Sequence, residues 1–209
     1  MKYIYGDTED GLKLPKPKFI LSIIGGAKNF KLSDRDRETE KAFKSGLMKA
    51  AKMNDTWIIT GGVNFGVMRL VGDAINEELN SNNIIVLGIA ERKSIFGKYA
   101  EFRKKSDGIP LEKNGQSLNE NNSSFIIVDN EHGEEYEFRT KLEAYIQQTL
   151  KIPFFIFVVN GDLKTIEIVV KSLDNNLPIV IVAVSHSFKK FQFKIFYCIF
   201  RILEVVLIS

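Results

Sequence analysis

A short apolar strand that runs into a glycine-rich turn and then a helix is the feature that most constrains this chain. The segment is WIITGGVNFGVMRLVGDA, residues 57–74. Its apolar start predicts a strand, its glycines predict a turn, and its later apolar residues recur with the spacing of a helix. In order, these groups are Trp57–Ile59; Thr60, Gly61, Gly62 and Gly66; and Val67, Met68, Leu70, Val71 and Ala74. A helix N-terminus preceded by glycines lets a phosphate approach the backbone closely, so the segment is a candidate phosphate site.

The same device occurs once more, earlier in the chain. The apolar run Phe19–Ile24 ends at Gly25 and Gly26. The second turn, after Thr60, does not fit the dinucleotide fingerprint G-x-G-x-x-G, and it lacks the Lys-Ser/Thr of a P-loop. Glycine pairs after strands are also common in simple tight turns. From spacing alone, both interpretations stay open.

Apolar runs and helical patterns alternate along the chain. The strand-like runs are Phe19–Ile24, Trp57–Thr60, Ile84–Ile89, Ser124–Val128, Phe154–Val159 and Pro178–Val184, and the helical patterns are Asp34–Met53, Val67–Leu79, Glu137–Leu150 and Leu163–Leu173. Most of the runs are continuous rather than alternating, which is typical of strands buried on both faces of a parallel sheet. We therefore predict an α/β fold with a Rossmann-like, doubly wound, mostly parallel sheet.

The length suits one α/β domain, or one domain with an appendage. The chain has 209 residues, of which 44% are hydrophobic, and a formal net charge of +3, which implies no strong field for nucleic acid. Its one cysteine, Cys198, excludes an internal disulfide. We divide the chain into an N-terminal tail (1–14), a nucleotide-binding domain (15–185) and an atypical apolar C-terminal segment (186–209). Charges at Arg201 and Glu204 disfavour a membrane helix there, which leaves a packed helix or strand, or a tail that is not native to the domain.

Several polar or glycine-containing turns follow the predicted strands. In open α/β sheets ligands lie at the carboxyl ends of the strands, where Gly25-Gly26, Thr60-Gly61-Gly62, Asp129-Asn130 and Gly161-Asp162 are all expected. Arg139, near the start of the next helix, is a candidate for a bidentate contact with a diphosphate. Its alternative role is that of a helix-surface arginine paired with Glu135 or Glu143. Thr60 is equally suited to a phosphate contact and to capping the turn.

Four separate strings resemble one known family, in the same order. They are PKFILSIIGGAKNF (residues 17–30), WIITGG–GVM–VGDA (57–74), SSFIIVDNEHG (123–133) and FRTKLEAYI (138–146). They are similar to the N-terminal cytosolic domain of melastatin-type TRP cation channels (TRPM), which belongs to the SLOG superfamily of Rossmann-like nucleotide sensors. The resemblance covers residues 15–181. It implies a regulatory, ligand-sensing domain at the cytosolic face of a calcium-permeable channel, soluble as a fragment, with channel subunits as partners in a tetramer.

The resemblance also implies a ligand and part of its site. An arginine at the place of Arg139 contacts ADP-ribose in the family, and a tyrosine before that helix, for which Tyr136 is the nearest match, stacks near the ligand. Together with the strand-end positions, this nominates Gly25, Gly26, Thr60, Gly61, Gly62, Gly66, Val67, Met68, Asp129, Tyr136 and Arg139 as ligand-binding residues. ADP-ribose or a related nucleotide is the expected ligand, and no cofactor, metal or catalytic residue is expected.

The chain also departs from the family pattern. Residues 183–187 lack the Gly-Ser-Gly-Arg loop whose arginine meets the nucleotide, and Ile24 replaces a threonine before the first glycine pair. An assembly domain with a vestigial cleft is therefore the alternative function. A SLOG-type nucleotide phosphoribohydrolase is a further alternative, disfavoured because residues 128–133 lack that group's Pro-Gly-Gly-x-Gly-Thr motif. His132, His186 and Cys198 likewise have no catalytic or metal-ligand spacing.

Overall fold

The computed structural model describes residues 12–26, 37–52, 55–78, 84–95, 116–128, 135–159, 161 and 163–182. Predictions that concern Asp129, most of the N-terminal tail and the C-terminal segment 186–209 lie outside these residues. Within them, no helix is long and apolar enough to cross a membrane.

The strands form one six-stranded sheet in the order β4-β3-β2-β1-β5-β6. Their bounds are β1 Phe19–Gly25, β2 Thr56–Thr60, β3 Ile85–Glu91, β4 Ser124–Val128, β5 Phe154–Val159 and β6 Ile179–Val182. Every neighbouring pair is parallel, with register pairs such as Leu21 with Ile58 and Leu21 with Phe155. This confirms the prediction of a doubly wound parallel sheet, with the strand order reversing between β1 and β5.

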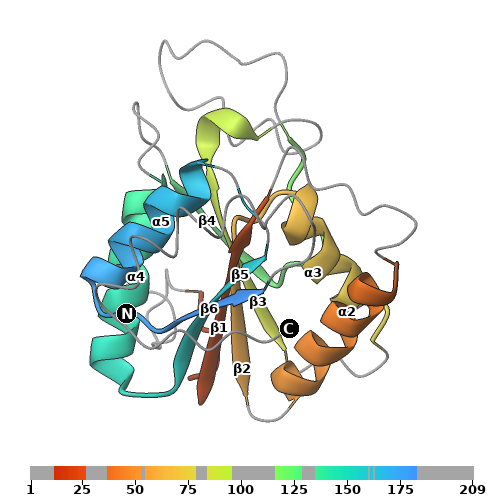
Figure 1. The fold of residues 1–209 in the computed structure, drawn as a ribbon, viewed down its shortest axis with the longest axis horizontal. Helices are drawn as coiled ribbons and strands as arrows, with labels where there is room; N and C mark the ends of the chain where they lie inside the picture. The colour runs from red at the N-terminus through yellow and green to blue at the C-terminus, as the bar shows by residue number, and fades with distance from the viewer. Residues whose placement is uncertain are drawn as a thin grey trace.

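Helices cover both faces of the sheet (Figure 1). On one face α2 (Arg37–Lys52) packs beside α3 (Gly66–Asn76), and on the other α4 (Glu135–Leu150) packs beside α5 (Leu163–Asp174). A short 3-10 helix, η3 (Arg92–Ser94), follows β3. The result is a three-layer α/β/α arrangement, whose connections bring the first turns of α3, α4 and α5 to the carboxyl edge of the sheet.

The continuous apolar strands are explained by a core on each side of the sheet. Successive side chains of a strand point to opposite faces. In β1, Ile20 and Ile24 pack toward α4 and α5, while Leu21 and Ile23 pack toward α2 and α3. Ser22, between them, is also fully buried. A polar side chain in the middle of a buried strand requires a hydrogen-bonding partner from the helical layer.

The turn after β2 depends on glycine for packing. Gly62 has a φ of +74°, and a Cβ atom placed on it would lie 3.0 Å from the Cα of Gly88 in β3. Gly88 itself has no space for a side chain, because a Cβ there would approach Asn122 and Gly62 within 2.5–2.7 Å. The two backbones therefore meet directly, and this contact fixes the turn against β3.

Replacing Gly62 by alanine should destabilise the fold by about 1–2 kcal/mol from the left-handed backbone alone, with the overlap against Gly88 adding to it. The matched control is Gly46→Ala in α2, where no atom lies within 4 Å of the added methyl group and φ is not positive. That variant should be more stable than the wild type by about 0.5–1 kcal/mol, since glycine is a poor helix residue. Urea unfolding of both variants measures the difference. Equal effects would contradict the packing role of Gly62.

Candidate functional site

A cleft of about 420 Å³ opens at the carboxyl ends of β1, β2 and β3, between α3 on one side and α4 and α5 on the other. We call it the edge cleft. Its lining includes Ile24, Gly25, Gly61, Val67, Met68, Glu91, Lys93, Glu135, Tyr136, Arg139, Lys164 and Thr165. It lies next to the point where the strand order reverses, which is where α/β sheets bind ligands. Its volume falls within the range of small-molecule pockets.

The polar groups of the glycine turn are largely used within the protein. The Thr60 hydroxyl accepts a hydrogen bond from the Gly62 N–H at 3.1 Å, which is the capping role that we weighed for it. The Val67 N–H, in the first turn of α3, donates to the Gly26 carbonyl at 3.2 Å. A side chain at Gly61 would come within 2.5 Å of the Met68 sulfur. The turn therefore presents only part of its N–H groups to the cleft.

Arg139 is buried, with 5% of its surface exposed, and it joins α4 to two strands. Its Nε donates to Glu143 Oε1 at 2.8 Å, and its Nη2 donates to the Ser22 hydroxyl at 2.7 Å. The same Nη2 lies 3.0 Å from the Ile23 carbonyl and 3.3 Å from the Ile59 carbonyl. Glu143 is one of the two partners that we weighed for Arg139. The prediction that this pair lies on the helix surface is wrong, because Arg139 is buried.

The ion pair between Arg139 and Glu143 also supplies hydrogen-bonding partners for Ser22, the buried polar residue of β1. The Ser22 hydroxyl donates to Glu143 Oε1 at 2.5 Å, and neither Ser22 nor Glu143 has any exposed surface. Glu143 Oε2 has no hydrogen-bond partner in the part of the chain that is described. We call Ser22, Arg139 and Glu143 the Arg139 cluster. Removing one member of a buried pair leaves a charge without compensation, so the cluster is expected to tolerate no single loss.

An acidic wall, formed by Glu91 at the end of β3 and Glu135 at the start of α4, lines another part of the edge cleft. Glu91 pairs with Lys93, whose Nζ is 2.8 Å from Oε1. Burial raises the pKa of Glu135 above its ordinary value of 4.5, and the neighbouring Glu91 raises it further, while a hydrogen bond to its own backbone, Lys164 and Lys93 oppose the shift. Lys164 lies over the Tyr136 ring, with Nζ 5.9 Å from the ring centroid.

The structure brings most of the nominated residues together. Gly25, Gly61, Val67, Met68, Tyr136 and Arg139 line the edge cleft. Thr60 at the end of β2, Gly66 at the start of α3, and Gly26 and Gly62 just after β1 and β2 are not among its lining residues. Asp129 is outside the described residues. Sequence reasoning did not nominate Glu91, Lys93, Glu135 or Lys164. Lys164 and Glu91 do sit at strand–helix junctions, so the strand-end rule held a signal for them.

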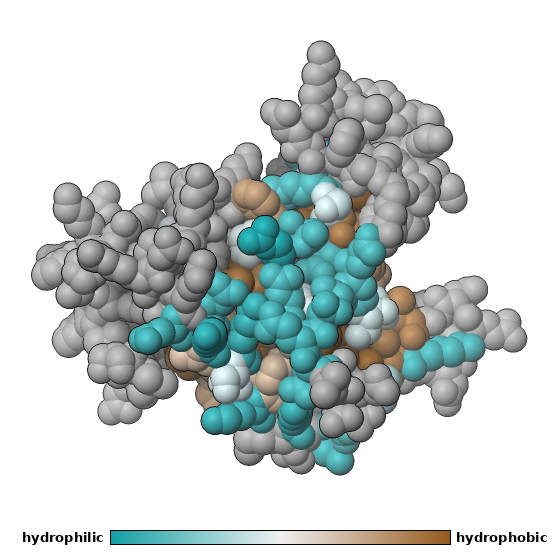
Figure 2. Space-filling model, turned by 90° about the vertical axis from the view of Figure 1, so that its right-hand side faces the viewer, coloured by the Kyte–Doolittle hydropathy of each residue, from teal (hydrophilic) through white to brown (hydrophobic). Residues whose placement is uncertain are grey.

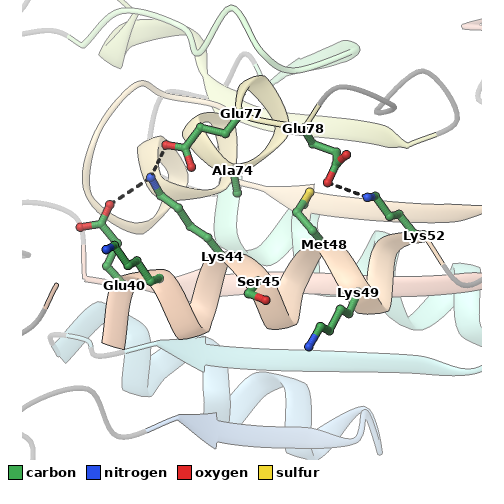
Figure 3. A pocket seen from close by; sticks show the side chains of 10 residues that line it. Glu40, Lys44, Ser45, Met48, Lys49, Lys52, Ala74, Glu77 and Glu78 are labelled. Atoms are coloured by element: carbon green, nitrogen blue, oxygen red, sulfur yellow. Dashed lines mark hydrogen bonds and ion pairs between the residues drawn. The ribbon is translucent and has the colours of Figure 1, made fainter. Parts of the chain in front are cut away.

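A second hollow, which we call the outer groove, has about 680 Å³ and lies between α2 and α3. This side of the molecule is mainly hydrophilic (Figure 2). Lys44 bridges Glu40 and Glu77 at 3.0 and 2.7 Å, Lys52 pairs with Glu78, and Lys49 points away from α3 (Figure 3). Burial of Lys44 opposes its ionisation, but hydrogen bonds to Glu77 and Glu40 outweigh that and raise its pKa. Its charges are mostly paired internally, so it is a weaker candidate than the edge cleft.

Comparison with known proteins decides the family. The model of the family described as "SLOG in TRPM" matches residues 5–188. The chain belongs to this SLOG family. Its relatives include the rat transient receptor potential cation channel subfamily M member 2, 34% identical over 194 residues, with 81% of this chain and 13% of the rat protein covered. The fruit-fly channel trpm is 31% identical, with 83% of this chain and 9% of that protein covered.

A third relative shows the same pattern. A subfamily M member-like 2 channel of Nematostella vectensis is 30% identical over 194 residues, with 79% of this chain and 12% of that protein covered. The chain thus spans about an eighth or less of the curated relatives it matches. The relatives are named as cation channels, and the matched part is their SLOG domain. In the described residues of this domain, no group of three or more metal-binding side chains occurs.

Truncating Arg139 should mainly lower the stability of this SLOG domain. Arg139→Ala leaves Glu143 buried without its partner, so we expect a loss of about 3–5 kcal/mol in the free energy of unfolding. The combined variant Ser22→Ala, Arg139→Met, Glu143→Leu should recover most of that loss, because apolar side chains then fill the site with no charge. Chemical denaturation measures both.

The control for Arg139 lies on the same helix. Lys141 pairs with Glu137 at 2.6 Å on the exposed side of α4, so Lys141→Ala should cost less than about 1 kcal/mol. An Arg139→Ala variant as stable as Lys141→Ala would contradict the structural role of the Arg139 cluster.

The raised pKa of Glu135 predicts a pH effect with a definite sign. The folded protein holds this proton more tightly than the unfolded chain, so the free energy of unfolding falls as pH rises from near 4.5 through the higher folded pKa. Glu135→Gln removes this penalty and should be more stable than the wild type at neutral pH, with the gain vanishing below pH 4.5. Thermal unfolding across pH checks this.

Glu137→Gln should change the stability at neutral pH in the opposite direction. Hydrogen bonding to Lys141 lowers the pKa of Glu137, so this residue stabilises the fold at neutral pH and loses that effect as the pH falls. The Gln variant should therefore be slightly less stable than the wild type at neutral pH. The same sign of change for both variants would contradict the assignment for Glu135.

Proposed function

We propose that this SLOG domain is a regulatory, ligand-sensing domain of a TRPM-like cation channel, and that it binds ADP-ribose or a related nucleotide in the edge cleft. The domain would then act at the cytosolic face of a membrane, as part of a subunit that assembles with other TRPM subunits, and without enzymatic activity of its own. The observation that carries the proposal is the convergence of Gly25, Gly61, Tyr136 and Arg139 on a cleft beside the strand-order reversal.

The charges around the cleft support a nucleotide diphosphate. Lys93, Arg139 and Lys164 all line it, and a diphosphate needs cationic or N–H donors. Tyr136 offers an aromatic surface, with Lys164 already above its ring. A nucleotide presents both an anionic diphosphate and a flat base, so one ligand can use both features.

The second candidate function is an assembly domain whose cleft is vestigial. Specific contacts favour it: the Nε and Nη2 groups of Arg139 are directed to protein acceptors, and the Thr60 hydroxyl is used within its turn. A ligand would have to use the remaining donors of the cleft, chiefly the lysines and the glycine backbone. A nucleotide-binding domain should therefore use Lys164 in binding, whereas an assembly domain with a vestigial cleft should show no nucleotide binding for Lys164 to affect.

Calorimetric titration of the 209-residue protein with ADP-ribose tests the proposal. We expect saturable binding that Lys164→Ala weakens about tenfold, the effect of losing one charge-assisted contact. Lys171→Ala is the matched control, because Lys171 lies further along α5 and does not line the cleft. The absence of heat and of thermal stabilisation at millimolar ADP-ribose, with the protein folded, would instead support the assembly domain.

A further inference from the structure

Glu135 is a carboxylate held in an unfavourable position at the edge cleft. It lies in the first turn of α4, lines the cleft, and its Oε2 is buried without a hydrogen-bond partner in the described part of the chain. Burying an ionised oxygen without a donor costs free energy. The start of α4 offsets only part of this cost through its dipole.

The neighbours of Glu135 offset only part of this cost, because a hydrogen bond to its own backbone, Lys164 and Lys93 lower its pKa by less than burial and Glu91 raise it. Glu91 repels it, and the Lys93 ammonium lies against Glu91 at 2.8 Å. Lys164 attracts Glu135 only at a distance and sits over Tyr136. In keeping with this, burial and Glu91 together raise the pKa of Glu135. A hydrogen-bond donor supplied by a ligand would satisfy the free oxygen.

The acidic wall restricts which part of a ligand can lie against it. Phosphate oxygens carry the same charge as Glu91 and Glu135 and are repelled there. Hydroxyl groups are uncharged and donate hydrogen bonds, and hydrogen bonds to an ionised acceptor are the stronger ones. The diphosphate of a bound nucleotide would then lie toward Gly25, Gly61 and the start of α3, with a sugar against the wall.

We propose that Glu135 is a specificity-determining residue that accepts hydrogen bonds from the hydroxyl groups of a ligand ribose, so that the edge cleft selects ligands with an intact ribose over equally charged ligands without it. This inference rests on the proposed nucleotide binding and names the part of the nucleotide that the acidic wall reads. It also accounts for the presence of an energetically costly carboxylate in the cleft, since functional sites commonly give up stability.

The test compares ADP-ribose with two analogues, each lacking the hydroxyl groups of one of its two riboses. They are titrated into the wild type, Glu135→Ala and Glu135→Gln, once with EDTA present and once with excess Mg²⁺ in its place. In the wild type, one analogue should bind about ten- to a hundredfold more weakly than ADP-ribose. Glu135→Ala should bind ADP-ribose more weakly by a similar factor and should no longer distinguish that analogue. The affinity of Glu135→Gln for ADP-ribose should lie between those of the wild type and Glu135→Ala, because its amide oxygen still accepts a hydrogen bond.

Glu137→Gln is the matched control, since it removes the same charge from the same helix turn outside the cleft. It should keep the full preference for intact ribose. A further readout separates recognition from a structural role: Glu135→Gln should bind more weakly while the free protein is more stable.

The outcomes separate this inference from the proposed function. If the wild type binds ADP-ribose neither in EDTA nor in Mg²⁺, both are overturned. If it binds both analogues as tightly as ADP-ribose, or if Glu135→Ala keeps the preference, only the role of Glu135 is overturned. Binding that needs added Mg²⁺, with a requirement that Glu135→Ala removes, would make the acidic wall a cation site and would also overturn the inference.

Discussion

The buried ion pair between Arg139 and Glu143 is the interaction on which the cleft depends. One guanidinium reaches the Ser22 hydroxyl and the carbonyls of Ile23 and Ile59, so it ties α4 to the carboxyl ends of β1 and β2. Desolvating both charges is costly, and the geometry offsets the cost only while every partner is present. The position of α4, and with it one side of the edge cleft, is therefore fixed by polar contacts within an otherwise apolar layer.

The opposite side of the cleft is fixed by close backbone packing instead. Gly62 meets Gly88 directly, and Gly26 accepts a hydrogen bond from the first turn of α3. These contacts place α3 against β1 and leave Gly61 and Met68 at the cleft. Glycine thus serves packing at least as much as ligand approach, which explains how a strand–glycine–helix segment can look like a phosphate loop without matching the known fingerprints.

The fold was predictable because its signals are local. Continuous apolar runs such as Phe154–Val159 predict buried parallel strands whatever the rest of the chain does. The role of Arg139 was not, since an Arg and a Glu four residues apart look the same on an exposed helix and in a core. Its burial depends on Ser22, which is distant in sequence. Lys93 and Lys164 were missed for the same reason: only the strand order brings them to one cleft.

The two sides of the cleft suggest how ligand choice can change within one fold. Ser22, Arg139 and Glu143 satisfy one another, so altering any of them alone is costly, and the deep part of the cleft is constrained by folding. Glu135 carries no such constraint, since burial and Glu91 raise its pKa and its Oε2 has no hydrogen-bond partner in the described part of the chain. Under the role proposed for Glu135, a substitution there would change recognition and spare stability. On that proposal, selectivity for the sugar can diverge at the start of α4 while the Arg139 cluster beneath it stays unchanged.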